Sequence, residues 1–200
     1  MANTVFTVGG LVAAILLVLL AATLAMPRLR IWPTPGAGTW QSYVFWPLFR
    51  SLNVLCFAVA ATHREPLLGL PLWLRILAGA LLIASTSLFI YSFRVLGRDN
   101  SYGAQDGLMT GGIYRWTRNP QNAMLVVVYG CLAVAADNGP TYLLCGAMMA
   151  VYTLMVLLEE PWLEEIYGEA YRQYCNRVPR FFAWRQAFLL ALAKIGARRS

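Results

Sequence analysis

Residues 5–26 read VFTVGGLVAAILLVLLAATLAM, an apolar stretch without a single charged side chain. A helix needs about 20 consecutive apolar residues to cross the hydrocarbon core of a bilayer, and this stretch is long enough. No lysine or arginine precedes it and further apolar runs follow, so we interpret it as a membrane span and not as a secretory signal. The fold is therefore expected to begin inside a membrane.

Further apolar runs follow, separated by turns rich in proline, glycine and charge. They cover approximately residues 41–61, 71–96, 120–136 and 140–158. No internal repeat and no strand-type alternation of any length accompanies them. The sequence therefore predicts an all-α integral membrane protein with about five transmembrane helices. A C-terminal amphipathic segment with a basic end, residues 188–199, is expected to lie on the membrane surface.

The composition points the same way. Of the 200 residues 59% are hydrophobic and 12% are charged, with a net charge of +7. This apolar excess argues against a soluble globule, a disordered tail and a disulfide scaffold. The arginines lie between apolar runs, so the expected partner is a lipid bilayer and no nucleic acid. The chain has one histidine and no CxxC spacing, so we expect no metal site.

The basic residues indicate an orientation. In a five-span arrangement 13 of the 16 lysine and arginine residues fall on one side of the membrane. Positively charged loops stay cytoplasmic, which predicts an outer N-terminus and a cytoplasmic C-terminus. Lys194 is the only lysine beside many arginines, a composition typical of GC-rich bacterial genomes, so a bacterial inner membrane is the expected location.

The longest polar stretch, residues 97–119, leads into the fourth apolar run at Pro120. Proline suits the first helical turn and asparagine is a good cap, so Asn119 is expected to cap a helix that begins at Pro120. The N–H groups and dipole of such a helix start favour a carboxylate or phosphate ligand. The alternative is a capped helix flanked by interfacial arginine and tryptophan, which is common in membrane proteins.

Two adjacent carboxylates, Glu159 and Glu160, follow the fifth run directly. A helix C-terminus disfavours negative charge, and Pro161 is expected to break or kink the helix at this point. One interpretation is a ligand that carries an ammonium, a sulfonium or a ribose diol. The other is that Pro161 begins a new helix, which explains the later acidic residues better than this pair.

An aromatic face follows the acidic pair. Its members share helical spacings and are Leu163, Tyr167, Tyr171 and Tyr174. This face could pack against the spans or form a wall for a purine ring.

Arg50 stands in the middle of the second apolar run, and Asn53 shares its face. A mid-span arginine is unfavourable unless it faces a cavity or a partner. The alternative is a shifted span in which Arg50 extends to the membrane surface.

Two motifs flank the last helical hairpin. The first contains Gly112, Tyr114, Arg118, Asn119, Pro120 and Asn122. The second contains Glu159, Glu160, Leu163, Tyr167, Gly168, Tyr171 and Tyr174, followed by Val178, Pro179 and Arg180. With these residues, the stretch 106–181 resembles the integral-membrane methyltransferases related to isoprenylcysteine carboxyl methyltransferase and the phospholipid N-methyltransferases.

This resemblance implies S-adenosylmethionine as cofactor. By position it places the cofactor-binding residues at Asp106, Gly107, Leu108, Met109, Tyr114, Arg118, Asn119, Pro120, Gln121, Asn122, Glu159 and Glu160. It also implies direct methyl transfer to a lipophilic or small, membrane-accessible acceptor. No catalytic base is assigned, and Arg50 is the candidate for contacting the substrate. No strand with a glycine fingerprint is present, which excludes a soluble Rossmann site for this cofactor.

The chain departs from the family pattern at three places. Asn119 stands where the family has histidine, and Asn122 where it has tyrosine. Residues 154–157 are apolar where the isoprenylcysteine enzymes carry an arginine, so methylation of prenylated proteins is not expected.

Two other functions remain open. Membrane reductases of the sterol-reductase type, which use NADPH, have a similar C-terminal half that includes runs like Tyr174–Cys175 and Val178–Pro179. A non-enzymatic membrane adaptor is the third possibility, and it predicts that Glu159→Gln would change no cofactor affinity.

The expected organisation has three parts. Residues 1–96 hold the first three transmembrane helices, and residues 97–182 hold the cofactor-binding loop, the next two helices and the methyltransferase-like motif. Residues 183–200 form a basic amphipathic tail.

Overall fold

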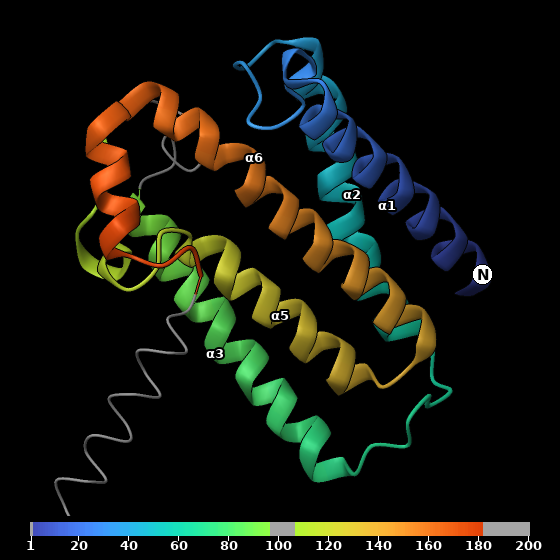
Figure 1. Cartoon of the computed structure of the whole chain (residues 1–200). Helices are drawn as coiled ribbons and strands as arrows, with labels where there is room; N and C mark the ends of the chain where they lie inside the picture. The colour runs from blue at the N-terminus through green and yellow to red at the C-terminus, as the bar shows by residue number, and fades with distance from the viewer. Residues whose placement is uncertain (1, 97–106, 182–200) are drawn as a thin grey trace, which may run out of the picture.

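The computed structural model describes residues 2–96 and 107–181, and over these residues the chain is helical with no strand (Figure 1). The elements are α1 (Ala2–Ala25), η1 (Pro27–Leu29), α2 (Trp40–Thr62), α3 (Leu72–Leu96), η2 (Gly112–Arg115), α5 (Pro120–Ala136) and α6 (Gly139–Arg177). The all-α prediction is confirmed. The predicted amphipathic segment 188–199 and the tail 183–200 lie outside the described residues.

Among the described elements, α1, α2, α3 and α6 are long and apolar enough to cross a membrane. The shorter apolar helix α5 has 17 residues. This set agrees with the prediction of about five membrane helices, and the chain is an integral membrane protein by these criteria.

The longest helix, α6, runs between two helix pairs (Figure 1). On one side α1 and α2 pack against each other and against α6, and on the other side α5 packs against α6 and α3 against α5. Helices α2 and α3 are consecutive in the chain but make little contact with each other. The two pairs are therefore joined mainly through α6.

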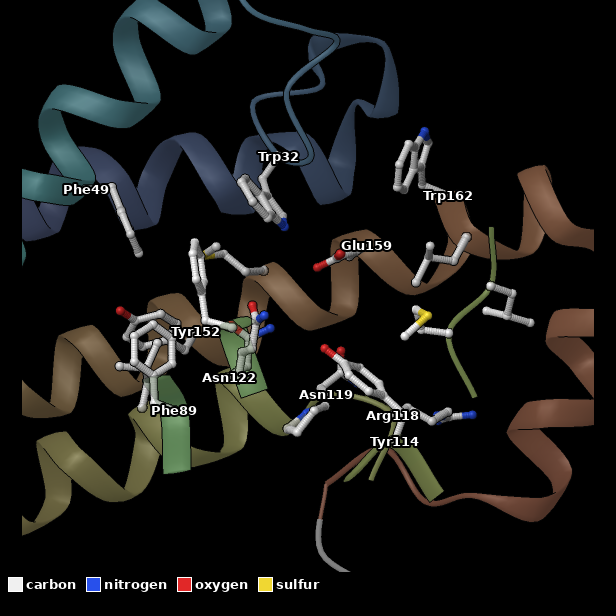
Figure 2. A pocket seen from close by; sticks show the side chains of 18 of the residues that line it. Trp32, Phe49, Phe89, Tyr114, Arg118, Asn119, Asn122, Tyr152, Glu159 and Trp162 are labelled. Carbon is white, nitrogen blue, oxygen red and sulfur yellow. The ribbon is translucent and has the colours of Figure 1, made fainter. Parts of the chain in front are cut away.

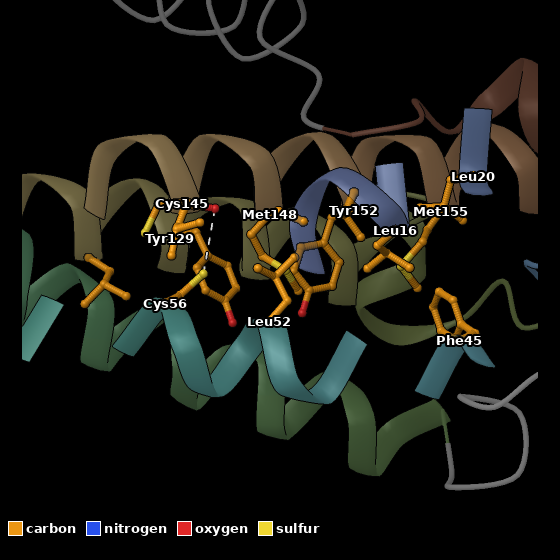
Figure 3. Close-up of a cluster of buried hydrophobic side chains, with 14 of the residues drawn as sticks. Leu16, Leu20, Phe45, Leu52, Cys56, Tyr129, Cys145, Met148, Tyr152 and Met155 are labelled. Carbon is orange, nitrogen blue, oxygen red and sulfur yellow. Dashed lines mark hydrogen bonds between the residues drawn. The ribbon is translucent and has the colours of Figure 1, made fainter. Parts of the chain in front are cut away.

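The core lies where α1, α2, α5 and α6 meet, and Figure 3 shows its side chains. Leu16, Phe45, Leu52 and Met148 are fully buried in it. Lipid tails are as apolar as leucine, so such contacts hold membrane helices together by close packing. Gly9 permits this closeness, because a Cβ at that position would lie 2.7 Å from a methyl carbon of Leu144.

The end of the bundle at the α5–α6 turn is tied by one buried carboxylate. Asp137 accepts hydrogen bonds from the backbone N–H groups of Leu68 (3.2 Å) and Leu70 (2.8 Å). Its own carbonyl accepts from the N–H of Leu67 at 2.8 Å. The loop between α2 and α3 is thus fixed to the turn between α5 and α6.

The predicted helix break at Pro161 is wrong in position. Helix α6 continues through Pro161 and leaves helical backbone at Gly168, where φ is 53° and ψ is −127°. Proline removes one helical hydrogen bond but its φ suits a helix, whereas a positive φ is free of strain only for glycine. After Gly168 the chain turns back toward the start of α5 (Figure 1).

Candidate functional site

A cavity of about 510 Å³ lies at the end of the bundle where α5 begins. Its walls come from α2, α3, α5 and α6, from the loop before α2 and from the segment before α5 (Figure 2). The volume is in the range of pockets that enclose small molecules.

Most of the residues singled out from the sequence line this cavity. They are Gly107, Leu108, Met109, Tyr114, Arg118, Asn119, Pro120, Gln121, Asn122 and Glu159, together with Arg50. Glu160 is not among the lining residues, and Asp106 lies outside the described part of the chain. Two motifs separated by a whole helical hairpin therefore meet at one cavity.

The adjacent glutamates have different surroundings. The carboxylate of Glu160 pairs with Arg118 at 3.1 Å and with Arg180 at 2.6 Å. The side chains of Glu160 and Arg118 are only 10% and 11% exposed. Consecutive helical residues point about 100° apart, so Glu159 faces the cavity while Glu160 faces the segment after α6. Glu160 thus joins the two motifs instead of lining the pocket.

Arg180, in the segment that follows α6, is the second arginine paired with Glu160. Its hydrogen bond to Glu160 raises the pKa of the Arg180 guanidinium, and the charge of the glutamate adds to the effect. The main chain adds a second tie, because the N–H of Arg118 donates to the carbonyl of Pro179 at 3.0 Å.

The predicted capping role of the Asn119 side chain is wrong. Asn119 is the N-cap residue of α5 but makes no side-chain capping hydrogen bond. Its amide instead donates to the carbonyl of Arg180 at 3.1 Å and to Glu160 at 3.4 Å. These acceptors lie away from the helix start, so the Asn119 side chain does not occupy the N-terminal N–H groups of α5. That helix start, Pro120–Asn122, lines the cavity.

Glu159 makes no ion pair within the described residues. Across the cavity, the N–H of Trp32 points toward its carboxylate (Figure 2). This N–H is buried and meets no acceptor at full hydrogen-bond geometry, and the Glu159 carboxylate is the acceptor that it faces. A carboxylate with so little compensation suits a ligand that brings a positive charge or hydroxyl donors.

The residues predicted to share a helical face, one leucine and three tyrosines, all line the cavity: Leu163, Tyr167, Tyr171 and Tyr174. The break at Gly168 divides them, so they do not lie along one straight helix. Tyr171 is buried and its hydroxyl has no hydrogen-bond partner among the residues described. This end of the cavity offers flat aromatic walls to a ring-shaped ligand.

Tyr114 connects this aromatic end to the polar loop. The hydroxyl of Tyr174 donates to the carbonyl of Tyr114 at 2.6 Å. Burial raises the pKa of the Tyr114 phenol, and the negative charge of Glu159 raises it further. The phenol therefore stays neutral and can donate a hydrogen bond into the cavity.

The other end of the cavity lies between α2 and α3 and is apolar. Phe49 and Val54 of α2 and Phe89 of α3 line it. Arg50 lies at this end, exposed, with its guanidinium 5.5 Å from the ring centre of Trp46. It makes no ion pair inside the described ranges.

A polar group lies between α2, α5 and α6, next to this apolar end. The Asn53 side-chain oxygen accepts hydrogen bonds from the hydroxyls of Tyr129 and Tyr152. Asn53 and Tyr152 both line the cavity. Asn53 was noticed in the sequence only because it shares a helix face with Arg50.

Sequence reasoning missed several lining residues, mostly aromatic: Trp32, Trp46, Phe49, Phe89, Phe93, Tyr152 and Trp162. Most lie in apolar runs, where an aromatic residue gives no sign of facing a cavity. Trp32 differs, because it stands in a proline-rich loop beside Pro33 and is nevertheless buried.

Residues 73–170 match the protein family described as phospholipid methyltransferase. No curated protein and no solved structure gives a significant match to the chain. The matched range contains Glu159 and the Pro120–Asn122 helix start, whereas Trp32 and α2 lie outside it.

Proposed function

We propose, from the match of residues 73–170 to the phospholipid methyltransferase family, that the protein transfers a methyl group from S-adenosylmethionine to an acceptor within the membrane. The observation that carries the proposal is the meeting of the Pro120–Asn122 helix start and Glu159 at one cavity. The family match supports a membrane methyltransferase in general, and the cavity supports the cofactor.

The proposed cofactor fits the chemistry of the lining residues. The positive end of the α5 dipole, at Pro120–Asn122, suits the methionyl carboxylate. Glu159 has no ion pair in the described structure and suits the ammonium or the ribose hydroxyls. Tyr167 and Tyr171 offer aromatic walls to the adenine ring. Arg118 also lines the cavity, but its charge is shared with Glu160.

S-adenosylmethionine supplies a methyl group that its sulfonium charge already activates. The protein therefore contributes mainly by holding the reactants in line and by excluding water. Aromatic side chains such as Tyr114 stabilise a nearby positive charge through their ring faces. We assign no general base, because positioning accounts for the residues at the cavity.

The acceptor is proposed to enter from the bilayer between α2 and α3. These helices make little contact, and Phe49, Val54 and Phe89 give the cavity an apolar wall on this side. Arg50 would contact an acidic or polar group of the acceptor, since it lines the cavity and makes no ion pair within the described ranges. A lipophilic acceptor with a polar head satisfies both features.

We propose that the cofactor end of the cavity faces the cytoplasm of a bacterial cell, with the protein in the inner membrane. The excess of arginine in the loops and the C-terminal segment on that side supports this orientation. Reporter fusions after the α1–α2 loop and after the α2–α3 loop test it. The first is expected to report cytoplasm and the second periplasm, and the reverse pattern contradicts the orientation.

The decisive experiment is calorimetric titration of S-adenosylmethionine into the purified protein. We expect saturable heat and protection from thermal unfolding, and a large loss of affinity in Glu159→Gln. Glu165→Gln is the matched control, because Glu165 is exposed and is not a cavity residue. Absence of both heat and protection refutes the proposal. Binding of NADPH instead supports a reductase, and a silent Glu159→Gln supports an adaptor.

A further inference from the structure

Trp32 brings an unusual group into the cavity from outside the matched family segment. It lies in the loop between α1 and α2, is 5% exposed, and lines the cavity. Its indole N–H is buried and meets no acceptor at full hydrogen-bond geometry in the part of the chain that is described, and Glu159 is the acceptor that acts on it. Figure 2 shows this N–H directed at the carboxylate of Glu159 from the opposite wall.

The orientation of the indole is fixed by its neighbours. Its ring packs against Phe45 at 4.9 Å and Trp46 at 5.9 Å between centroids. The loop itself is attached to α6, because the guanidinium of Arg30 lies 5.7 Å from the ring centre of Trp162. The N–H is therefore held facing the Glu159 carboxylate, with which it makes no full hydrogen bond, and a ligand bound beside both groups can supply a second acceptor.

The two facing groups have complementary requirements. An indole N–H only donates, and an ionised carboxylate only accepts. An ammonium or a sulfonium placed between them would satisfy Glu159 but leave Trp32 unpaired. A hydroxyl satisfies both, since it donates its proton and accepts at its oxygen. A pair of neighbouring hydroxyls is the ligand group that suits this arrangement best.

We propose that Trp32 is a cofactor-binding residue, and that its indole N–H and the Glu159 carboxylate together hold the ribose diol of the cofactor. The inference rests on the proposed function and makes it more specific. It assigns the ribose, and not the ammonium, to Glu159. It also makes the loop of residues 27–39, which the family segment lacks, a part of the cofactor site.

The test compares binding of S-adenosylhomocysteine and of its 2′-deoxy and 3′-deoxy analogues by calorimetry. In the wild-type protein at least one deoxy analogue is expected to bind about tenfold more weakly or worse, because a buried partner is left unpaired. In Trp32→Phe the parent ligand is expected to bind about three- to tenfold more weakly, and one deoxy penalty is expected to shrink. Trp40→Phe is the control, because Trp40 is 54% exposed and does not line the cavity.

The outcomes separate this inference from the proposed function. Wild-type binding of both deoxy analogues with the same affinity as S-adenosylhomocysteine overturns the inference and leaves the methyltransferase proposal standing. Unchanged affinity in Trp32→Phe also overturns it. No binding of S-adenosylhomocysteine or S-adenosylmethionine to the wild type overturns both. The wild-type comparison needs no variant, so it decides the matter even if Trp32→Phe folds poorly.

Discussion

Replacing Glu160 by glutamine should destabilise the protein strongly. Glu160 is 10% exposed and compensates the charge of Arg118, which is 11% exposed. Removing one partner of a buried ion pair costs about 3–5 kcal/mol, because the other charge stays buried and unpaired. The pair with Arg180, whose side chain is 44% exposed, adds at most about 1 kcal/mol. Glutamine keeps the shape of the side chain, so we expect a loss near the lower limit, about 3 kcal/mol.

Thermal unfolding of the purified protein measures this loss. In a chain of this size about 1 kcal/mol shifts Tm by about 2–4 °C, so Glu160→Gln should lower Tm by about 6–12 °C. Glu164→Gln is the matched control. Glu164 is 48% exposed and pairs with the exposed Arg172, so its loss should lower Tm by no more than about 4 °C.

The reasoning fails if the two variants unfold at the same temperature. It also fails if the double variant Glu160→Gln with Arg118→Gln is less stable than Glu160→Gln alone, because removing both charges should recover part of the loss. A destabilised Glu159→Gln beside an unaffected Glu160→Gln would mean that the roles of the two glutamates are reversed.

Three further changes test other parts of the structure. Arg50→Gln should raise the KM for the acceptor and leave cofactor affinity unchanged, and an equal loss of both would place Arg50 at the cofactor instead. Gly168→Ala should lower stability by about 1–2 kcal/mol, because φ at this position is 53° and strains a residue with a side chain. The loss would come from the backbone alone, since a Cβ would meet nothing within 4 Å. An unchanged Tm would show that the break tolerates a side chain. Asp137→Ala should lower stability by about 3 kcal/mol, because it leaves two backbone N–H donors unpaired. Cofactor affinity should stay unchanged, because Asp137 lies at the opposite end of α5 from the cavity. Weaker cofactor binding would contradict this separation.

Much of the fold follows from apolar length. The run of residues 5–26 and the four later runs correspond to α1, α2, α3, α5 and α6, because a bilayer leaves a chain little choice other than helix. The start of α5 at Pro120 was also predicted correctly. Local rules succeed here because each depends on a few adjacent residues.

The errors arise where distant contacts override local preference. Asn119 stands at a capping position, but its amide donates to the Arg180 carbonyl after α6 and to the Glu160 carboxylate of α6. Pro161 stands where a break was expected, yet Gly168 takes the turn because it alone adopts the positive φ. Neither outcome can be obtained from spacing alone.

The different directions of Glu159 and Glu160 could be predicted from helix geometry. Neighbouring helical residues point about 100° apart, so Glu159 and Glu160 are not expected to face the same wall. Which of them faces the cavity depends on where Arg118 and Arg180 lie, and that is a tertiary property. The position of Trp32 in the cavity wall also depends on tertiary packing, since its loop reaches the cavity only when α1 and α2 pack on α6.

The walls of the cavity come from two parts of the chain, and only one of them belongs to the matched family segment. Residues 73–170 supply Glu159 and the helix start at Pro120, whereas α2, outside the matched segment, supplies Trp46, Phe49 and Arg50. Under the proposed function, substitutions at Phe49 or Arg50 would change the acceptor end, whereas Trp46 also packs against Trp32 at the cofactor end. A protein restricted to the family segment would lack the cavity walls that Trp32, Trp46, Phe49 and Arg50 provide.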